Sequence, residues 1–180
     1  DISSLVKEHP WLQIHSNSIE EYIHPRYYEK LLKEYSFNGK IDLGHFEDSL
    51  KLLKNPKYIL EFGSGSGRAT DIFLKNVKIF KRLDLVDLSP HMILWLKNKY
   101  KKNKDIKKIW SDSIKYIRST NKKYDFIFSL WSFSHSIHQH LEQNGSKKAS
   151  GYIKKTLVKF FINNLKSIID LGTMRLTVIF

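Results

Sequence analysis

The chain has 180 residues, of which 41% are hydrophobic and 13% aromatic, so it is long enough to form one globular domain with a sizeable core. It has no cysteine, which excludes disulfides, thiolate metal sites and a cysteine nucleophile. No apolar run approaches the ~18 residues of a membrane-spanning helix, and no signal-peptide pattern opens the chain. We therefore expect a cytoplasmic protein without a membrane partner. The formal net charge of +13 keeps a nucleic-acid partner open.

Residues 1–57 are predicted to form a helical cap or lid segment in front of the main domain, which we place at residues 58–180. Pro25 suits the first turn of a helix that reaches about residue 35. Apolar spacing between residues 46 and 53 indicates another helix, which Asn55-Pro56 ends. Aromatic and basic side chains of this segment either pack against the domain or cover a ligand site; they are Tyr22, Arg26, Tyr27 and Tyr28.

A glycine-rich turn follows the first predicted strand. Residues 58–70 read YILEFGSGSGRAT: an apolar run, the acidic Glu61, glycines at alternate positions and the start of a helix near residue 69. Strand, glycine turn and helix together bring a ligand against bare backbone at a helix N-terminus. We expect a side chain at Gly63 or Gly65 to block that approach, and we expect positive φ angles in the turn.

The spacing of the glycines distinguishes between cofactors. A dinucleotide fingerprint, G-x-G-x-x-G, needs a third glycine at position 68, where this chain has Arg68. The pattern E-x-G-x-G-x-G resembles motif I of the class I S-adenosylmethionine (SAM) methyltransferases. This resemblance implies that Glu61, Gly63, Ser64, Gly65 and Gly67 contribute to binding SAM, with S-adenosylhomocysteine as the product.

The second predicted strand, residues 83–87, ends at Asp87, 20 residues after the last motif glycine. An acidic side chain at this strand tip accepts hydrogen bonds from ribose hydroxyls in related folds. The following string, DLSPHMI, is similar to a turn that is common in class I methyltransferases. The resemblance places Leu88 against adenine and adds Met92 to the cofactor site, whereas Asp87 taken alone could be a helix cap.

The third predicted strand covers residues 106–110 and precedes two further candidates for the cofactor site. The resemblance implies that Asp112, with Ser113 beside it, accepts a hydrogen bond from the exocyclic amine of adenine. Capping of a helix is the alternative role of Asp112. Seven lysines crowd residues 97–108. They connect a helix to the start of this strand, at the sheet edge opposite the ligand site. We therefore expect a solvated basic face, with a remote site for an anionic partner as the alternative.

The fourth predicted strand, residues 124–130, carries the tip where this fold places its chemistry. Ser129 and Trp131 lie at that tip, as cofactor and substrate candidates. His135 lies where related O-methyltransferases have a histidine, and His138 shares its helical face. A histidine can take a proton near neutral pH. General base or substrate positioning, a structural hydrogen bond, and a metal site that would also include His140 remain open; we expect no metal.

Residues 142–150 are predicted to be a loop, residues 151–170 a helix and residues 174–180 a fifth strand. The predicted fold is α/β, with a Rossmann-like, mostly parallel sheet of order 3-2-1-4-5 and helices on both faces. The family's sixth and seventh strands have no counterpart in the sequence. We therefore expect the edge from Thr173 to Phe180 to pair with a second copy, with another chain, or with residues outside the given sequence.

The resemblance implies an enzyme, a SAM-dependent methyltransferase that acts on an oxygen or nitrogen of a small molecule, with His135 as the candidate base. Two other functions remain open. One is an inactive methyltransferase-like subunit of a larger assembly, which the unfinished sheet favours. The other is an RNA-directed methyltransferase or nucleic-acid-binding module, which only the net charge favours.

Overall fold

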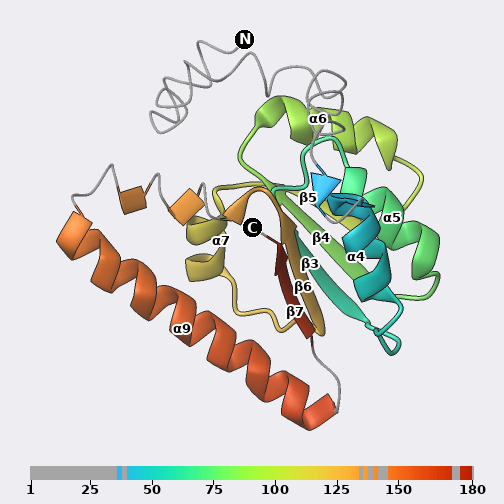
Figure 1. Ribbon diagram of the computed structural model, residues 1–180. Coiled ribbons are helices and arrows are strands. Elements are labelled where there is room, and N and C mark those ends of the chain that lie inside the picture. Colours follow the sequence, from blue (N-terminus) through green and yellow to red (C-terminus); the bar gives the residue numbers. More distant parts are fainter. Residues whose placement is uncertain are drawn as a thin grey trace.

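The computed structural model describes residues 36–37, 40–133, 136–137, 140–141, 146–171 and 175–179 (Figure 1). Its centre is a parallel sheet of order β5-β4-β3-β6-β7. The strands are β3 (Tyr58–Phe62), β4 (Arg82–Asp87), β5 (Ile106–Trp110), β6 (Phe126–Leu130) and β7 (Arg175–Ile179). The predicted order is confirmed for the first four strands, and β7 pairs with β6 at the sheet edge. The partner expected at that edge stays a prediction.

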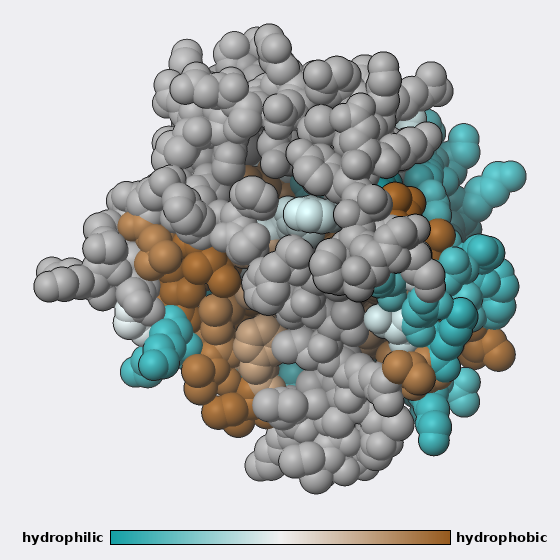
Figure 2. Space-filling model, in the orientation of Figure 1, coloured by the Kyte–Doolittle hydropathy of each residue, from teal (hydrophilic) through white to brown (hydrophobic). Residues whose placement is uncertain are grey.

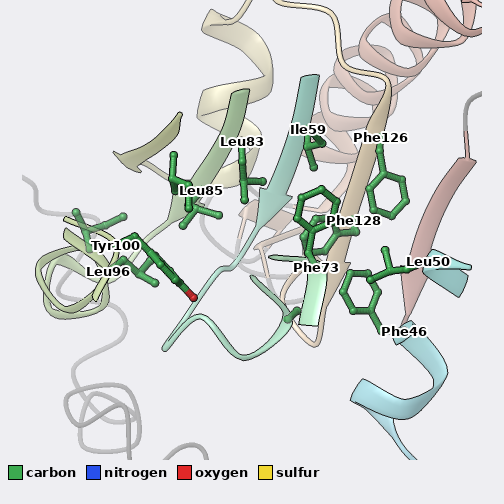
Figure 3. Packing of buried hydrophobic residues seen from close by; sticks show 13 residues of the cluster. Phe46, Leu50, Ile59, Phe73, Leu83, Leu85, Leu96, Tyr100, Phe126 and Phe128 are labelled. Carbon is green, nitrogen blue, oxygen red and sulfur yellow. The ribbon is translucent and has the colours of Figure 1, made fainter. Parts of the chain in front are cut away.

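Helices cover both faces of the sheet, and alternate strand residues point to opposite faces. On one face, Ile59 packs with α4 (Asp42–Leu50), α5 (Arg68–Asn76) and α6 (Pro90–Lys99). Figure 3 shows this cluster, in which Phe46 of α4 lies beside Phe128 of β6. On the other face, Leu60 packs with α7 (Ser113–Ser119) and α9 (Ser146–Leu171).

Two local predictions need correction or completion. Helix α9 begins at Ser146, so residues 146–150 are not part of a loop. Gly151 lies inside this helix with open space around it, and an exposed glycine costs a helix only about 1 kcal/mol. Within residues 1–57, which were predicted to be helical, the structure has the short antiparallel strands β1 (Ser36–Phe37) and β2 (Lys40–Ile41). The helices predicted before residue 36 lie outside the described residues.

The surface differs between the two sides of the molecule. Figure 2 shows hydrophilic residues on the side of α4 and α5, and apolar residues gathered on the side of α9. On α9, Tyr152, Val158 and Ile162 are exposed. Within the part of the chain that the structure describes, no helix is both long and apolar enough to span a membrane.

Candidate functional site

A cavity opens where the carboxyl ends of β3 and β6 meet the start of α5. Its empty volume is about 310 Å³, which includes space open to solvent. The glycine loop between β3 and α5 forms much of its wall, together with one residue of α4 and the last residue of β6. The lining residues are Leu43, Glu61, Gly63, Ser64, Gly65, Ser66, Arg68, Ala69 and Leu130. The position agrees with the ligand edge of an open α/β sheet.

The glycine loop has the left-handed backbone predicted for it. The φ angles are 65° at Gly63, 51° at Gly65 and 86° at Gly67, a region that residues with a side chain rarely enter. A Cβ atom at Gly63 would collide with the side chain of Ser132, and one at Gly67 would collide with Tyr100. The absence of a side chain at Gly63 therefore makes room first for the protein itself, and not only for a ligand as the sequence had indicated.

Asp87 joins the glycine loop to the tip of β4. Its carboxylate accepts from the backbone amides of Gly65, at 2.7 Å, and Ser89, at 2.8 Å. Burial raises the pKa of Asp87, and the backbone hydrogen bonds oppose that rise. Each carboxylate oxygen can accept a further hydrogen bond. The side chain can thus hold the loop and still receive the ribose hydroxyls that the sequence analysis assigned to it.

Glu61, the last acidic residue before the loop, is buried beneath the cavity. Its Oε2 accepts from the hydroxyl of Thr70 at 2.6 Å, and the residue is 2% exposed. Burial raises the pKa of Glu61 to about 8, against the lowering effect of the Thr70 hydrogen bond. A neutral carboxyl group therefore predominates at pH 7, and its charge depends on what else enters the cavity.

Asp42 at the start of α4 binds two parts of the cavity wall together, an arrangement that sequence reasoning missed. It accepts a two-point contact from the guanidinium of Arg68, at 3.0 and 3.1 Å. It also accepts from the indole of Trp131 at 3.0 Å. Trp131 has a φ of 59°, a strained conformation for a bulky residue at a strand tip. We call these three residues the Asp42 clamp.

Asp112 has two partners and one unsatisfied atom. Its Oδ1 caps α7 by accepting from the amide of Lys115 at 2.8 Å, and it lies 2.7 Å from Nε2 of His140. Its Oδ2 is buried without a partner among the described residues. The cap that the sequence analysis weighed as an alternative is therefore present, and one oxygen remains for a donor such as an amine. His140, which the sequence analysis named only as a candidate metal ligand, contacts the side chain of Asp112.

The other predicted residues fall into two groups. Ser113 and Ser129 are buried at 4% and 3% exposure, close to the ends of β5 and β6, and Met92 is buried within α6 at 1%. The carbonyl of Leu88 accepts from Trp110. A second group lies outside the described residues and comprises Tyr22, Arg26, Tyr27, Tyr28, His135 and His138. Among described side chains, no group of three or more potential ligands is placed to hold a metal ion.

The chemistry of the site fits SAM, which carries an amino acid end, a ribose and an adenine. Arg68 lines the cavity, and although Asp42 takes two of its N–H donors, a guanidinium has five and can also donate to a ligand carboxylate. Three buried oxygen atoms have no hydrogen-bond partner among the described residues: the hydroxyls of Ser64 and Ser129 and Oδ2 of Asp112. Buried polar atoms are normally satisfied, so these unsatisfied atoms are consistent with a polar ligand in this region.

Comparison with known families identifies one match. The sequence profile of a family described as "AdoMet dependent proline di-methyltransferase" matches residues 40–166; AdoMet is another name for SAM. No curated protein matches the chain.

Comparison with solved structures finds many matching chains, of which three are described here. One, from Thiobacillus denitrificans, is a SAM-dependent methyltransferase with bound S-adenosylhomocysteine; it shares 22% identity over 50% of this chain and 36% of its own, with a TM-score of 0.40. Another, from Staphylococcus aureus, is described as a caffeoyl-CoA O-methyltransferase; it shares 19% identity over 68% of this chain and 59% of its own, with a TM-score of 0.44. A third is the Trypanosoma brucei PRMT1 enzyme–prozyme complex. It shares 21% identity over 54% of this chain and 33% of its own, with a TM-score of 0.41. The chain thus covers about a third to three fifths of the length of these three structures.

Proposed function

Because the chain belongs to the family of AdoMet-dependent proline di-methyltransferases, we propose that it methylates the nitrogen of an N-terminal proline. This acceptor replaces the small molecule expected from the sequence. The proposal rests mainly on the match of the family profile to residues 40–166. The cavity at the carboxyl ends of the strands supports the cofactor that this reaction needs, because its lining suits the amino acid end of SAM.

The chemistry of proline restricts where the methyl groups can go. Inside a polypeptide, the proline nitrogen is an amide whose electron pair is delocalised into the carbonyl, so it is not a nucleophile. At a free N-terminus the same nitrogen is a secondary amine, which can accept one methyl group and then a second. Two transfers give a quaternary ammonium with a permanent positive charge. Within a polypeptide, only a proline at a free N-terminus therefore fits a di-methyltransferase of this kind.

Separate groups of residues would hold the cofactor. Asp87 would accept from its ribose hydroxyls, Oδ2 of Asp112 from the amine of adenine, and Arg68 would face its carboxylate. The backbone of the glycine loop would lie against it without interposed side chains. When bound there, SAM supplies a methyl group on a positively charged sulfur. The residues of the chain contribute mainly by orienting the two reactants. In many enzymes such orientation accounts for a large part of the lowering of the activation barrier.

The acceptor needs a base, because an amine at a chain terminus is largely protonated near neutral pH. His135 follows β6 by a few residues, and a histidine has a suitable pKa for taking that proton. A second proton must leave before the second methyl group is accepted. We also propose that Trp131, which donates to Asp42 from the tip of β6, forms part of the wall of the acceptor site.

A panel of acceptors with methyl-labelled SAM tests this function. The panel contains a peptide with a free N-terminal proline, the same peptide acetylated, a peptide with only internal proline, a generic RNA, and free proline. We expect label in the free N-terminal peptide and not in its acetylated form. His135→Ala should lower turnover by about 10²–10⁴-fold and leave S-adenosylhomocysteine affinity unchanged. Labelled RNA would support the RNA-directed alternative, and binding without transfer to any acceptor would support an inactive subunit.

A further inference from the structure

The last turn of α6 contacts the glycine loop, although none of the contacting side chains lines the cavity. The carbonyl of Ser66 accepts from the indole of Trp95 at 3.2 Å and from Nζ of Lys99 at 3.0 Å. The hydroxyl of Tyr100 lies 3.1 Å from the carbonyl of Gly67, and Figure 3 shows it directed toward the turn between β3 and α5. We call Trp95, Lys99 and Tyr100 the α6 brace.

The brace also contacts the first turn of α5. Lys99 and Tyr100 each lie 2.6 Å from an oxygen of Asp71. Burial, reinforced by Asp71, raises the pKa of Tyr100 above its usual range, so the hydroxyl keeps its proton and remains a donor. Tyr100 also fills the space that a side chain at Gly67 would need.

The glycine content of the loop explains why the α6 brace matters for cofactor binding. Three of the five loop residues from Gly63 to Gly67 are glycines with positive φ, and glycine has more conformational freedom to lose than any other residue. The opposite side of the loop is fixed by the Asp87 carboxylate at Gly65. The α6 brace fixes the second half of the loop, because Trp95 and Lys99 both donate to the carbonyl of Ser66.

Lys99 was predicted to belong to a basic run facing away from the site. The structure separates it from that run by its contacts: Nζ of Lys99 donates to the carbonyl of Ser66 and pairs with Asp71, and its side chain is 26% exposed. Lys97 is an exposed residue in the same helical turn. We propose that Lys99 is a positioning residue: with Trp95 and Tyr100 it holds the glycine loop in its cofactor-binding conformation without touching the cofactor. This inference depends on the family's cofactor and not on the identity of the methyl acceptor.

Lys99→Met tests the brace, with Lys97→Met as the matched control that removes the same charge from the same turn. In the ligand-free protein, amide hydrogen exchange of the loop should become about tenfold faster in Lys99→Met and stay unchanged in Lys97→Met. The affinity for S-adenosylhomocysteine, measured by calorimetry, should fall by about tenfold in Lys99→Met only. Lys99→Arg, which keeps a donor, should restore most of both.

Asp71→Asn separates the carbonyl contact from the ion pair. It removes the charge that Lys99 pairs with and leaves the carbonyl of Ser66 available to Lys99. If loop exchange and affinity respond to Asp71→Asn as strongly as to Lys99→Met, the effect comes from the ion pair and the proposal is wrong. The proposal is equally wrong if Lys97→Met matches Lys99→Met, or if Lys99→Met leaves exchange of the loop unchanged. Wild-type protein that binds no S-adenosylhomocysteine would instead count against the proposed function, and the exchange comparison would still decide the inference.

Discussion

Asp87 connects the loop and the ribose site through one carboxylate. Asp87→Asn keeps the size of the side chain, but its amide nitrogen cannot accept from Gly65 or Ser89, the two donors in the structure. Charge-assisted hydrogen bonds contribute ~1.5–3 kcal/mol each, so we expect the affinity for S-adenosylhomocysteine to fall at least about tenfold. Calorimetry measures this, with the exposed Asp105→Asn as a control. Equal affinities in both variants would remove Asp87 from the site.

Glu61 makes the free energy of unfolding depend on pH. Burial raises the pKa of Glu61 to about 8 in the folded protein from its ordinary value of 4.5, so the folded state holds a proton that the unfolded state releases between these pH values. Stability should therefore fall as the pH rises from about 4.5 to about 8, by at most about 1.4 kcal/mol per pH unit from this residue.

Glu61→Gln cannot ionise and should lose that dependence, because the glutamine oxygen can still accept from Thr70. Urea unfolding of both proteins at several pH values between 5 and 8 measures the difference, and the variant should gain stability relative to the wild type toward pH 8. Parallel curves across this range would show that Glu61 titrates near its ordinary pKa.

At the scale of elements, α4 is tied to α5 and to the tip of β6 by the Asp42 clamp. Asp42→Asn leaves the Arg68 guanidinium, 12% exposed, without its charged partner. Breaking a buried ion pair costs about 3–5 kcal/mol, and we expect about 2–4 kcal/mol here because the arginine retains some exposure. Asp48→Asn on the same helix is the control, since its pair with Lys51 is exposed and surface pairs contribute less than about 1 kcal/mol. Urea unfolding should separate the two variants; a similar small loss in both would contradict the clamp.

The elements that could be predicted from sequence are those with a local signal. The predicted bounds of β3, β4, β5 and β6 lie within about two residues of the observed ones. The signal was clearest for β3 and β6, because buried parallel strands are nearly continuous in hydrophobicity. The start of α9 was missed because residues 146–150, SKKAS, lack the apolar spacing of a helix, and the exposed Gly151 that follows them does not end a helix by itself. The glycine loop and Asp87 could be found because their spacing along the chain sets their geometry.

Other parts of the site could not be predicted because they depend on contacts between distant residues. The hydrogen bond from Trp131 to Asp42 joins residues 89 positions apart, and Lys99 reaches Ser66 across 33. No local pattern marks such pairs. The one available signal was Arg68, a bulky cation where the dinucleotide motif has glycine. It indicated a different ligand without showing that Asp42 would hold it.

For the whole molecule, the net charge of +13 is a weak guide to function. The lysines of residues 97–108 are exposed except for the half-buried Lys108, but they differ in their contacts. Lys99 donates to the glycine loop, and Lys108 donates to the carbonyls of Tyr100 and Ile106. A single basic surface therefore does not account for the run. The family and the cavity are better guides to the substrate than the charge.

Tandem mass spectrometry of one reaction tests the central claim most directly. The protein is incubated with SAM and a peptide that has a free N-terminal proline and an internal lysine, with Asp87→Asn as the impaired control. The account predicts two methyl groups, both on the N-terminal nitrogen, and far slower product formation by Asp87→Asn. Methyl groups on the internal lysine, or an unmodified peptide with wild-type protein that binds S-adenosylhomocysteine, would contradict it.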